Sequence, residues 1–328
     1  MKFVPPGPSF KIGDSLKGKR IFLVANGLNY PYVQNLLSGM KEAAELVGAS
    51  VSAGDSAGDP TKAATLVQQA IGQGYDAIIT QSVPAALIAQ PLTAASKAGI
   101  PVIEMFGSDP ELPSAKLKAM GVSGIVSSCF GCGGEEMAEA AFAESGEEVD
   151  AVVFSTPEIG VGKLEGEKFV SRLKELCPSC ESRVVDAPLA SWSTDLTSAA
   201  QSALQRDPSV NYLAPVFDAM VQFVEPAVAS SGQDVKIVTY DGTQGGLEAV
   251  QKGTVAADPG SMQIWLGWAA IDQLGRIETS TPIVADSNVP NRMFSSQNIG
   301  EVDPSSDEAG WYGSFDFKSS FSKVWEVE

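Results

Sequence analysis

A short loop near the N-terminus combines side chains that could bind a small polar molecule. The apolar run 20–25 ends before Asn26, and Tyr30 and Tyr32 lie on either side of Pro31, where a helical pattern begins. A loop between a strand and a helix is a common place for a binding site in an α/β protein. This loop has neither the lysine of a P-loop nor a GxGxxG sequence. The residues therefore favour a ligand other than a phosphate group.

The 328 residues include no histidine. Histidine is the usual general base of a serine or cysteine triad and the commonest zinc ligand. In addition, no pair of carboxylates has the setting that glycoside hydrolysis requires. We therefore expect no catalytic residue, no bound metal and no cofactor.

The charge balance argues against some classes of partner. The chain has 40 acidic and 22 basic residues, a net charge of -18, and such a field repels nucleic acid and anionic lipid. No apolar run approaches the roughly 20 residues of a membrane span, and the first residues lack the apolar core of a signal peptide. We expect either a cytoplasmic protein or a mature sequence with an added methionine, and no nucleic-acid partner.

The four cysteines form two close pairs, Cys129 with Cys132 and Cys177 with Cys180, separated by 44 residues. Four-cysteine zinc sites typically separate their pairs by about 15–20 residues, so a metal is disfavoured. Two local disulfides are the preferred interpretation, with free thiols or cross-pairing as the alternative. Disulfides would indicate an exported protein. Cys129 and Cys132 precede a helix start, as in a redox site, but a structural bridge is preferred.

Short apolar segments alternate with helical patterns in both halves of the chain. This alternation predicts α/β architecture, with parallel sheets covered by helices in two Rossmann-like lobes. We expect the chain to cross first between the lobes around residues 121–134, and the strand-end loops of both lobes to line one cleft. The predicted strands cover residues 20–25, 50–53, 77–80, 101–105, 151–155, 182–187, 211–216 and 235–241.

The ordered segments "IFLVANGLNYPYV", "GYDAIITQSV", "AGIPVIEMF", "ASWSTDL" and "KIVTYDGTQGG" resemble the type I periplasmic binding proteins, especially their sugar-binding, ribose-binding-protein-like branch. The resemblance extends from residue 19 to about residue 294. It implies two lobes joined by a multi-strand hinge. The N-terminal lobe would comprise 1–127 and about 262–283, and the C-terminal lobe and tail 128–261 and about 284–328.

The resemblance also implies a set of ligand-binding residues. Aromatic rings would pack on the C–H faces of a sugar, while amide and carboxylate groups would bind its hydroxyl groups. Trp192 matches the position of a covering ring. The other matching positions are Asn26, Tyr30, Tyr32, Gln81, Tyr240 and Asp241.

Several positions depart from the family pattern. Phe106-Gly107 stands where many relatives have Asp-Arg, Lys163 replaces an arginine, and Phe217-Asp218 replaces Asn-Asp. The bidentate clamp for a pyranose is thus reduced, which favours a smaller polyol, a deoxy or modified sugar, or a less polar cyclic solute. The departing positions expected at the ligand are Phe106, Ser128, Lys163, Phe217 and Asp218.

Structural roles remain alternatives for several of these residues. Trp192 could pack at a helix boundary, Asp241 could be a turn residue, and Lys163 could be a solvated lysine of a first helical turn. Phe106 and Phe217 could be ordinary core residues.

The resemblance implies a monomeric extracytoplasmic solute-binding protein of an ABC importer, whose permease subunits would be its partners. It would bind a small neutral polyhydroxylated solute (a sugar, polyol or modified sugar) by domain closure, without a chemical reaction. Two alternatives remain: a cytoplasmic effector domain of the LacI type, and an α/β enzyme acting on a sugar. The first needs a helix-turn-helix, and only about eighteen proline-rich residues precede the first strand.

Overall fold

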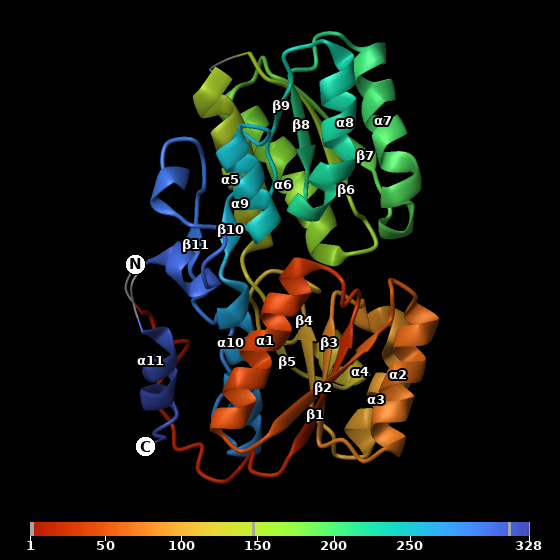
Figure 1. The fold of residues 1–328 in the computed structure, drawn as a ribbon. Helices are drawn as coiled ribbons and strands as arrows, with labels where there is room; N and C mark the ends of the chain where they lie inside the picture. The colour runs from red at the N-terminus through yellow and green to blue at the C-terminus, as the bar shows by residue number, and fades with distance from the viewer. Residues whose placement is uncertain (1–2, 146–147, 314–315, 328) are drawn as a thin grey trace. The chain divides into compact units, whose positions relative to one another are not determined.

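The computed structural model describes residues 3–145, 148–313 and 316–327. The chain divides into two compact units, which are described separately (Figure 1). Unit 1 comprises residues 1–128, 262–290 and 312–328, and unit 2 comprises residues 129–261 and 291–311.

Unit 1 contains a five-stranded parallel sheet in the order β2-β1-β3-β4-β5. Its central strand β3 is buried along its whole length. In Figure 1, α2 and α3 lie on one side of this sheet and α1 and α10 on the other. The strands are β1 (Arg20–Ala25), β2 (Ser50–Asp55), β3 (Ala77–Gln81), β4 (Val102–Met105) and β5 (Val122–Val126). The helices are α1 (Pro31–Leu46), α2 (Pro60–Gly72), α3 (Ala89–Lys97), α4 (Ala115–Met120), α10 (Gln263–Glu278) and α11 (Phe317–Val324).

Two glycines allow α1 and α10 to pack closely in unit 1. A Cβ atom on Gly39 would collide with the carbonyl group of Ile264, and one on Gly267 would collide with that of Leu36. Helix α10 is buried from Gln263 to Arg276. It therefore acts as a core element of unit 1, although it follows most of unit 2 in the sequence.

Unit 2 contains a four-stranded parallel sheet in the order β7-β6-β8-β9 and a short antiparallel pair, β10 with β11. The strands are β6 (Asp150–Ser155), β7 (Glu181–Asp186), β8 (Tyr212–Pro215), β9 (Lys236–Ile237), β10 (Gly260–Ser261) and β11 (Asn291–Arg292). The helices are α5 (Phe130–Ser145), α6 (Gly160–Leu176), α7 (Trp192–Arg206), α8 (Val221–Ser231) and α9 (Gln244–Lys252).

These sheets confirm the predicted α/β class with two parallel-sheet lobes. Strand β5 was not predicted, because Ser123 and Gly124 interrupt its apolar pattern. The structure explains this glycine: a Cβ atom on Gly124 would lie 3.0 Å from Cγ of Gln273 on α10. In the part of the chain that the structure describes, no helix has the length and apolar character needed to span a membrane.

The two predicted local disulfides are confirmed. Cys129 is bonded to Cys132 at the start of α5, and Cys177 is bonded to Cys180 between α6 and β7. The Cα atoms of the pairs are 5.2 and 5.3 Å apart, respectively. Each bridge closes a single turn of chain.

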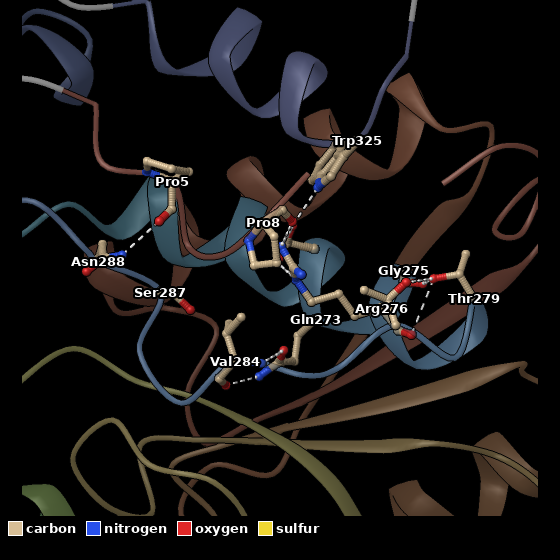
Figure 2. A network of polar contacts seen from close by, with 12 residues as sticks. Pro5, Pro8, Gln273, Gly275, Arg276, Thr279, Val284, Ser287, Asn288 and Trp325 are labelled. Atoms are coloured by element: carbon tan, nitrogen blue, oxygen red, sulfur yellow. Dashed lines mark hydrogen bonds and ion pairs between the residues drawn. The ribbon is translucent and has the colours of Figure 1, made fainter. Parts of the chain in front are cut away.

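The expected assignment of residues 284–328 to the C-terminal lobe agrees with the structure for residues 291–311, which belong to unit 2, and differs for the remainder. Residues 284–290 and 312–328 belong to unit 1. The tail helix α11 leads to Trp325, whose ring stacks on Trp268 of α10 at 5.4 Å and whose indole N–H donates to Asp272 Oδ1 at 2.7 Å. The proline-rich N-terminal lead also reaches α10, because Arg276 Nη2 donates to the carbonyl oxygen of Pro8 at 3.1 Å (Figure 2). Sequence periodicity could not reveal these contacts, since they join segments more than 50 residues apart.

Replacing Trp325 with alanine tests this arrangement. Trp325 is fully buried, so the substitution W325A leaves a large cavity beside α10. We expect it to lower the free energy of unfolding by about 3–5 kcal/mol, measured by urea denaturation. The control K323A changes an exposed residue of the same tail. Equal losses in the two variants would contradict the proposed anchoring role of the tryptophan.

Candidate functional site

In unit 1, the ends of two neighbouring strands are tied together by predicted site residues. Asn26 follows β1 and is 9% exposed, and Gln81 ends β3 and is 4% exposed. The backbone N–H of Asn26 donates to Gln81 Oε1 at 3.0 Å. Gln81 Nε2 in turn donates to Ser82 Oγ at 2.6 Å. The Gln81 amide therefore fixes the loop that carries Asn26.

Tyr32 and Phe106 form an aromatic pair in the same unit. Their ring centroids are 5.6 Å apart with planes at 81°, an edge-to-face arrangement that aromatic rings favour. Phe106 has a φ of 65°, which is unusual for a bulky residue and costs on the order of 1–3 kcal/mol. This backbone conformation directs the chain after β4, at the position where the family pattern has Asp-Arg.

Tyr30 is the N-cap residue of α1, and its ring lies against Gly27. Partial burial, and secondarily the negative charge of Asp55, raise the pKa of the Tyr30 hydroxyl, so it remains a neutral hydrogen-bonding group at ordinary pH. Ser128, also predicted at the ligand, is buried at the end of the first segment of unit 1. Its carbonyl oxygen accepts a hydrogen bond from Ser127 Oγ at 3.1 Å.

In unit 2, the structure brings together the predicted residues Trp192 and Phe217. Their ring centroids are 6.2 Å apart, and only 5% of Trp192 and 8% of Phe217 are exposed. The indole N–H of Trp192 donates to the carbonyl oxygen of Ala187 at 2.9 Å, which fixes the ring after β7. Gly162 leaves space for Phe217, because a Cβ atom there would lie 2.9 Å from Cζ of the ring.

Two other predicted residues of unit 2 are placed differently. Tyr240 is 1% exposed, and its ring packs edge-on against Phe130 at 5.6 Å and covers Gly133. Lys163 has a side chain that is 61% exposed and pairs with Glu167 at 3.6 Å, one turn along α6. The structure therefore gives Tyr240 a packing contact and Lys163 a surface contact.

Asp218 and Asp241 lie beyond the ends of β8 and β9, and both are buried. Asp218 Oδ2 accepts hydrogen bonds from Thr243 N at 2.9 Å and Thr243 Oγ1 at 2.5 Å. Burial raises the pKa of Asp218 to about 6, against the opposing effect of the hydrogen bonds from Thr243. Burial, followed by the charges of Asp218 and Asp258, raises the pKa of Asp241 well above its ordinary value.

Asp258 is a third acid of this group, and sequence reasoning missed it. It is fully buried, its Oδ1 accepts from the backbone N–H of Gly242 at 3.2 Å, and burial followed by the charge of Asp218 raises its pKa. A carboxylate within the otherwise uncharged segment 253–261 was the signal that could have revealed it. Among the described residues, no group of three or more acidic or cysteine side chains is arranged to hold a metal ion.

Each unit thus places polar and aromatic residues beyond the carboxyl ends of its parallel strands. The unit 1 set consists of Asn26, Tyr30, Tyr32, Gln81 and Phe106, and the unit 2 set consists of Trp192, Phe217, Asp218 and Asp241. Such sets are typical of proteins that bind small molecules at strand ends of an open α/β sheet.

Comparison with known proteins identifies the family. Residues 21–279 match the family model of the periplasmic binding protein domain, and the chain belongs to this family. The predicted membership of the type I periplasmic binding proteins is thereby confirmed.

The chain is also similar to individual members of the family. It is 25% identical over 246 residues to the ribose import binding protein RbsB of Bacillus subtilis, which covers 73% of this chain and 76% of that protein. An ABC transporter solute-binding protein from Agrobacterium vitis with bound α-D-tagatopyranose matches with a TM-score of 0.78 and 16% identity, over 91% of this chain and 100% of that one. A second from A. vitis, with bound allitol, matches with a TM-score of 0.75 and 21% identity, over 87% and 98%.

Replacing Gly246 of α9 tests the packing of the acid group. A Cβ atom at this position would collide with Asp258 Oδ2 and lie 2.5 Å from Asp218 Oδ2. We expect G246A to lower the free energy of unfolding by about 1–3 kcal/mol in urea denaturation, because it overpacks a buried site. The neighbouring G245A is a matched control, since nothing lies within 4 Å of its added Cβ. A loss in G245A as large as that in G246A would show that the carboxyl groups do not limit the space.

Proposed function

We propose that this protein is the extracytoplasmic solute-binding component of an ABC importer and that it binds a small neutral polyhydroxylated solute. The residues proposed to bind the solute are those of the unit 1 set and the unit 2 set, each considered within its own unit. The protein would release the solute unchanged, and no residue is assigned a chemical step.

The observation that carries this proposal is the composition of the unit 2 set within a member of this family. The tilted pair of Trp192 and Phe217 offers apolar ring surface, and the nearby Asp218 and Asp241 offer hydrogen-bonding groups. A sugar or polyol presents both C–H faces and hydroxyl groups, so it matches both kinds of group.

The charges of the unit 2 set also favour an uncharged ligand. The raised pKa values of Asp218 and Asp241 mean that burial disfavours their ionised forms. An anionic solute would add a negative charge beside these acids, at a further electrostatic cost. A protonated carboxyl group can donate as well as accept a hydrogen bond, which suits a hydroxyl group.

The partners and compartment follow from the same proposal. We infer that permease subunits of the importer receive the solute and that the protein acts as a monomer outside the cytoplasm, without a nucleic-acid partner. The two disulfides support an oxidising compartment, because cytosolic thiols are normally kept reduced.

A thermal-shift screen tests the proposed ligand class. The panel would contain D-ribose, D-allose, D-tagatose, allitol and myo-inositol, with gluconate and glucosamine as charged counterparts. At a concentration of about 100 Kd, a true ligand should stabilise the protein by about 2.7 kcal/mol and should be recovered unchanged. Stabilisation by the charged solutes alone, or conversion of a solute, would contradict the proposal.

Truncation of Trp192 tests the residue assignment with the best solute of that panel. We expect W192A to weaken binding by about 30-fold or more in calorimetry, because a buried ring at a binding centre typically contributes about 2 kcal/mol. Trp311 provides a matched control within unit 2, since it is 3% exposed and its indole donates to Asp303 instead. Affinity that falls equally in W192A and W311A would indicate a general packing defect.

A further inference from the structure

The side chains of Asp218 and Asp258 face each other within unit 2. Both flank Gly246, because a Cβ atom built on this glycine would touch Oδ2 of Asp258 and Oδ2 of Asp218. Asp258 is fully buried and Asp218 is 6% exposed. Two carboxyl oxygens therefore border one carbon-sized space that only a glycine leaves open.

The hydrogen bonds of the two acids fix which oxygens are involved. Asp218 Oδ2 accepts from Thr243, and Asp258 Oδ1 accepts from the backbone N–H of Gly242. Within the described part of the chain, Asp258 Oδ2 has no hydrogen-bond partner although it is buried. The acids thus hold two successive residues of one loop, and the remaining oxygen of Asp258 points toward Asp218.

Two ionised carboxylates in this arrangement would be strongly unfavourable. A buried like-charged pair cannot readily carry two negative charges, and one retained proton relieves both the desolvation and the repulsion. A carboxyl O–H on one acid can then donate to the carboxylate of the other. Burial and the neighbouring charge of Asp218 raise the pKa of Asp258, in agreement with this arrangement.

The other charged groups around the pair do not supply a compensating cation. Asp241, on the loop after β9, adds a further negative charge. On α9, Lys252 is 70% exposed and pairs with Glu248. The backbone N–H of Asp258 donates to the carbonyl oxygen of Phe294. Arg292, two residues earlier in that segment, pairs with Glu301.

Tyr240 is the remaining titratable group next to the pair. Its carbonyl oxygen accepts from the backbone N–H of Asp218 at 2.8 Å, and its ring lies against Phe130. A tyrosine is neutral over the pH range in which these acids titrate, so it does not supply a positive charge. Among these neighbouring groups, a proton is therefore the available compensation.

We propose that Asp258 is a positioning residue for the unit 2 set. It shares one proton with Asp218, and the pair thereby holds the loop Gly242–Thr243, and with it Asp241, in position for the solute. This proposal rests on the proposed function and adds a residue through which that function depends on pH. Asp258 acts through Asp218 and the loop, without touching the solute itself.

The sign of the pH dependence follows from the raised pKa values. The stabilisation by the protonated acids is fully present below about pH 4, the ordinary value for aspartate, and is lost as pH rises through the folded-state pKa. For Asp218 this window ends at about 6, and for Asp258, whose pKa burial also raises, it likewise ends well above the ordinary value for aspartate. As the pH rises through this window, the folding equilibrium constant falls by up to about tenfold per pH unit for each such proton.

Carboxyl titration of the full chain by ¹³C NMR, without ligand, is the first test. We expect coupled titration of Asp218 and Asp258, with one proton retained above the ordinary aspartate range. Stability in urea should fall as pH rises from about 4 through the raised folded-state pKa values, of which that of Asp218 is about 6. In D258N, the asparagine amide can donate to Asp218 and its oxygen can accept from Gly242 N, so the shared proton is no longer needed. In this variant the coupling should disappear. Its folding equilibrium constant should decrease less steeply with rising pH than that of the wild type, by up to about tenfold per pH unit.

D234N is the matched control, because it removes an exposed aspartate of unit 2 and should keep the wild-type profile. Titration of both buried acids with ordinary pKa values, or a D258N profile identical to wild type, would overturn the shared proton. D258L, which cannot donate or accept, should lose affinity for the best panel solute at every pH, whereas D258N should retain it above pH 6. Equal affinity of D258L and wild type would overturn the positioning role.

The two proposals can fail separately. If no solute of the panel binds while the carboxyl titration shows a shared proton, the proposed function is wrong and the acid pair remains. If a solute binds but its affinity is independent of pH in both wild type and D258N, the function remains and the positioning role is wrong.

Discussion

The geometry of parallel strands is the constraint on which the rest of the structure depends. Within the main sheet of each unit the strands are parallel, so the loops that follow them gather at one edge of that sheet. This edge brings Asn26 to Gln81 in unit 1 and Asp218 to Asp241 in unit 2, although the members of each pair lie at least 23 positions apart in the sequence. These side chains are buried, so their polar groups must find partners within the protein.

Burial of acidic groups illustrates two solutions to the same energetic problem. In unit 1, Asp272 forms an ion pair with Arg276 at 2.7 Å and accepts a hydrogen bond from the indole N–H of Trp325. In unit 2, no lysine or arginine among the described residues forms an ion pair with Asp218 or Asp258, and retained protons are the remaining means of compensation. The first arrangement anchors the C-terminal tail to α10. The second links the shape of a binding loop to pH.

The sequence predicted the elements whose signal is local, and the site positions that the family pattern marks stay predictions. The pair of Trp192 and Phe217 was expected at the ligand, and the structure brings the two rings together. Tyr240 was expected there as well, yet its ring packs against α5, because residues that adjoin in sequence can point to opposite faces of a strand end. Asp258 was missed, since its importance arises from a facing acid forty residues earlier in the chain.

By itself, the sequence determined the alternation of strands and helices, the local cysteine bridges and the family, because periodicity, close spacing and ordered motifs are properties of short segments. Only the tertiary structure decided that Phe106 adopts a left-handed conformation, that Gly246 leaves room for two acids, and that residues 312–328 belong to unit 1. These features depend on contacts between distant segments, and the local sequence around a residue does not specify the energy of such a contact. Burial, which raises the pKa values of Asp218, Asp241 and Asp258, is likewise a property of the folded protein alone.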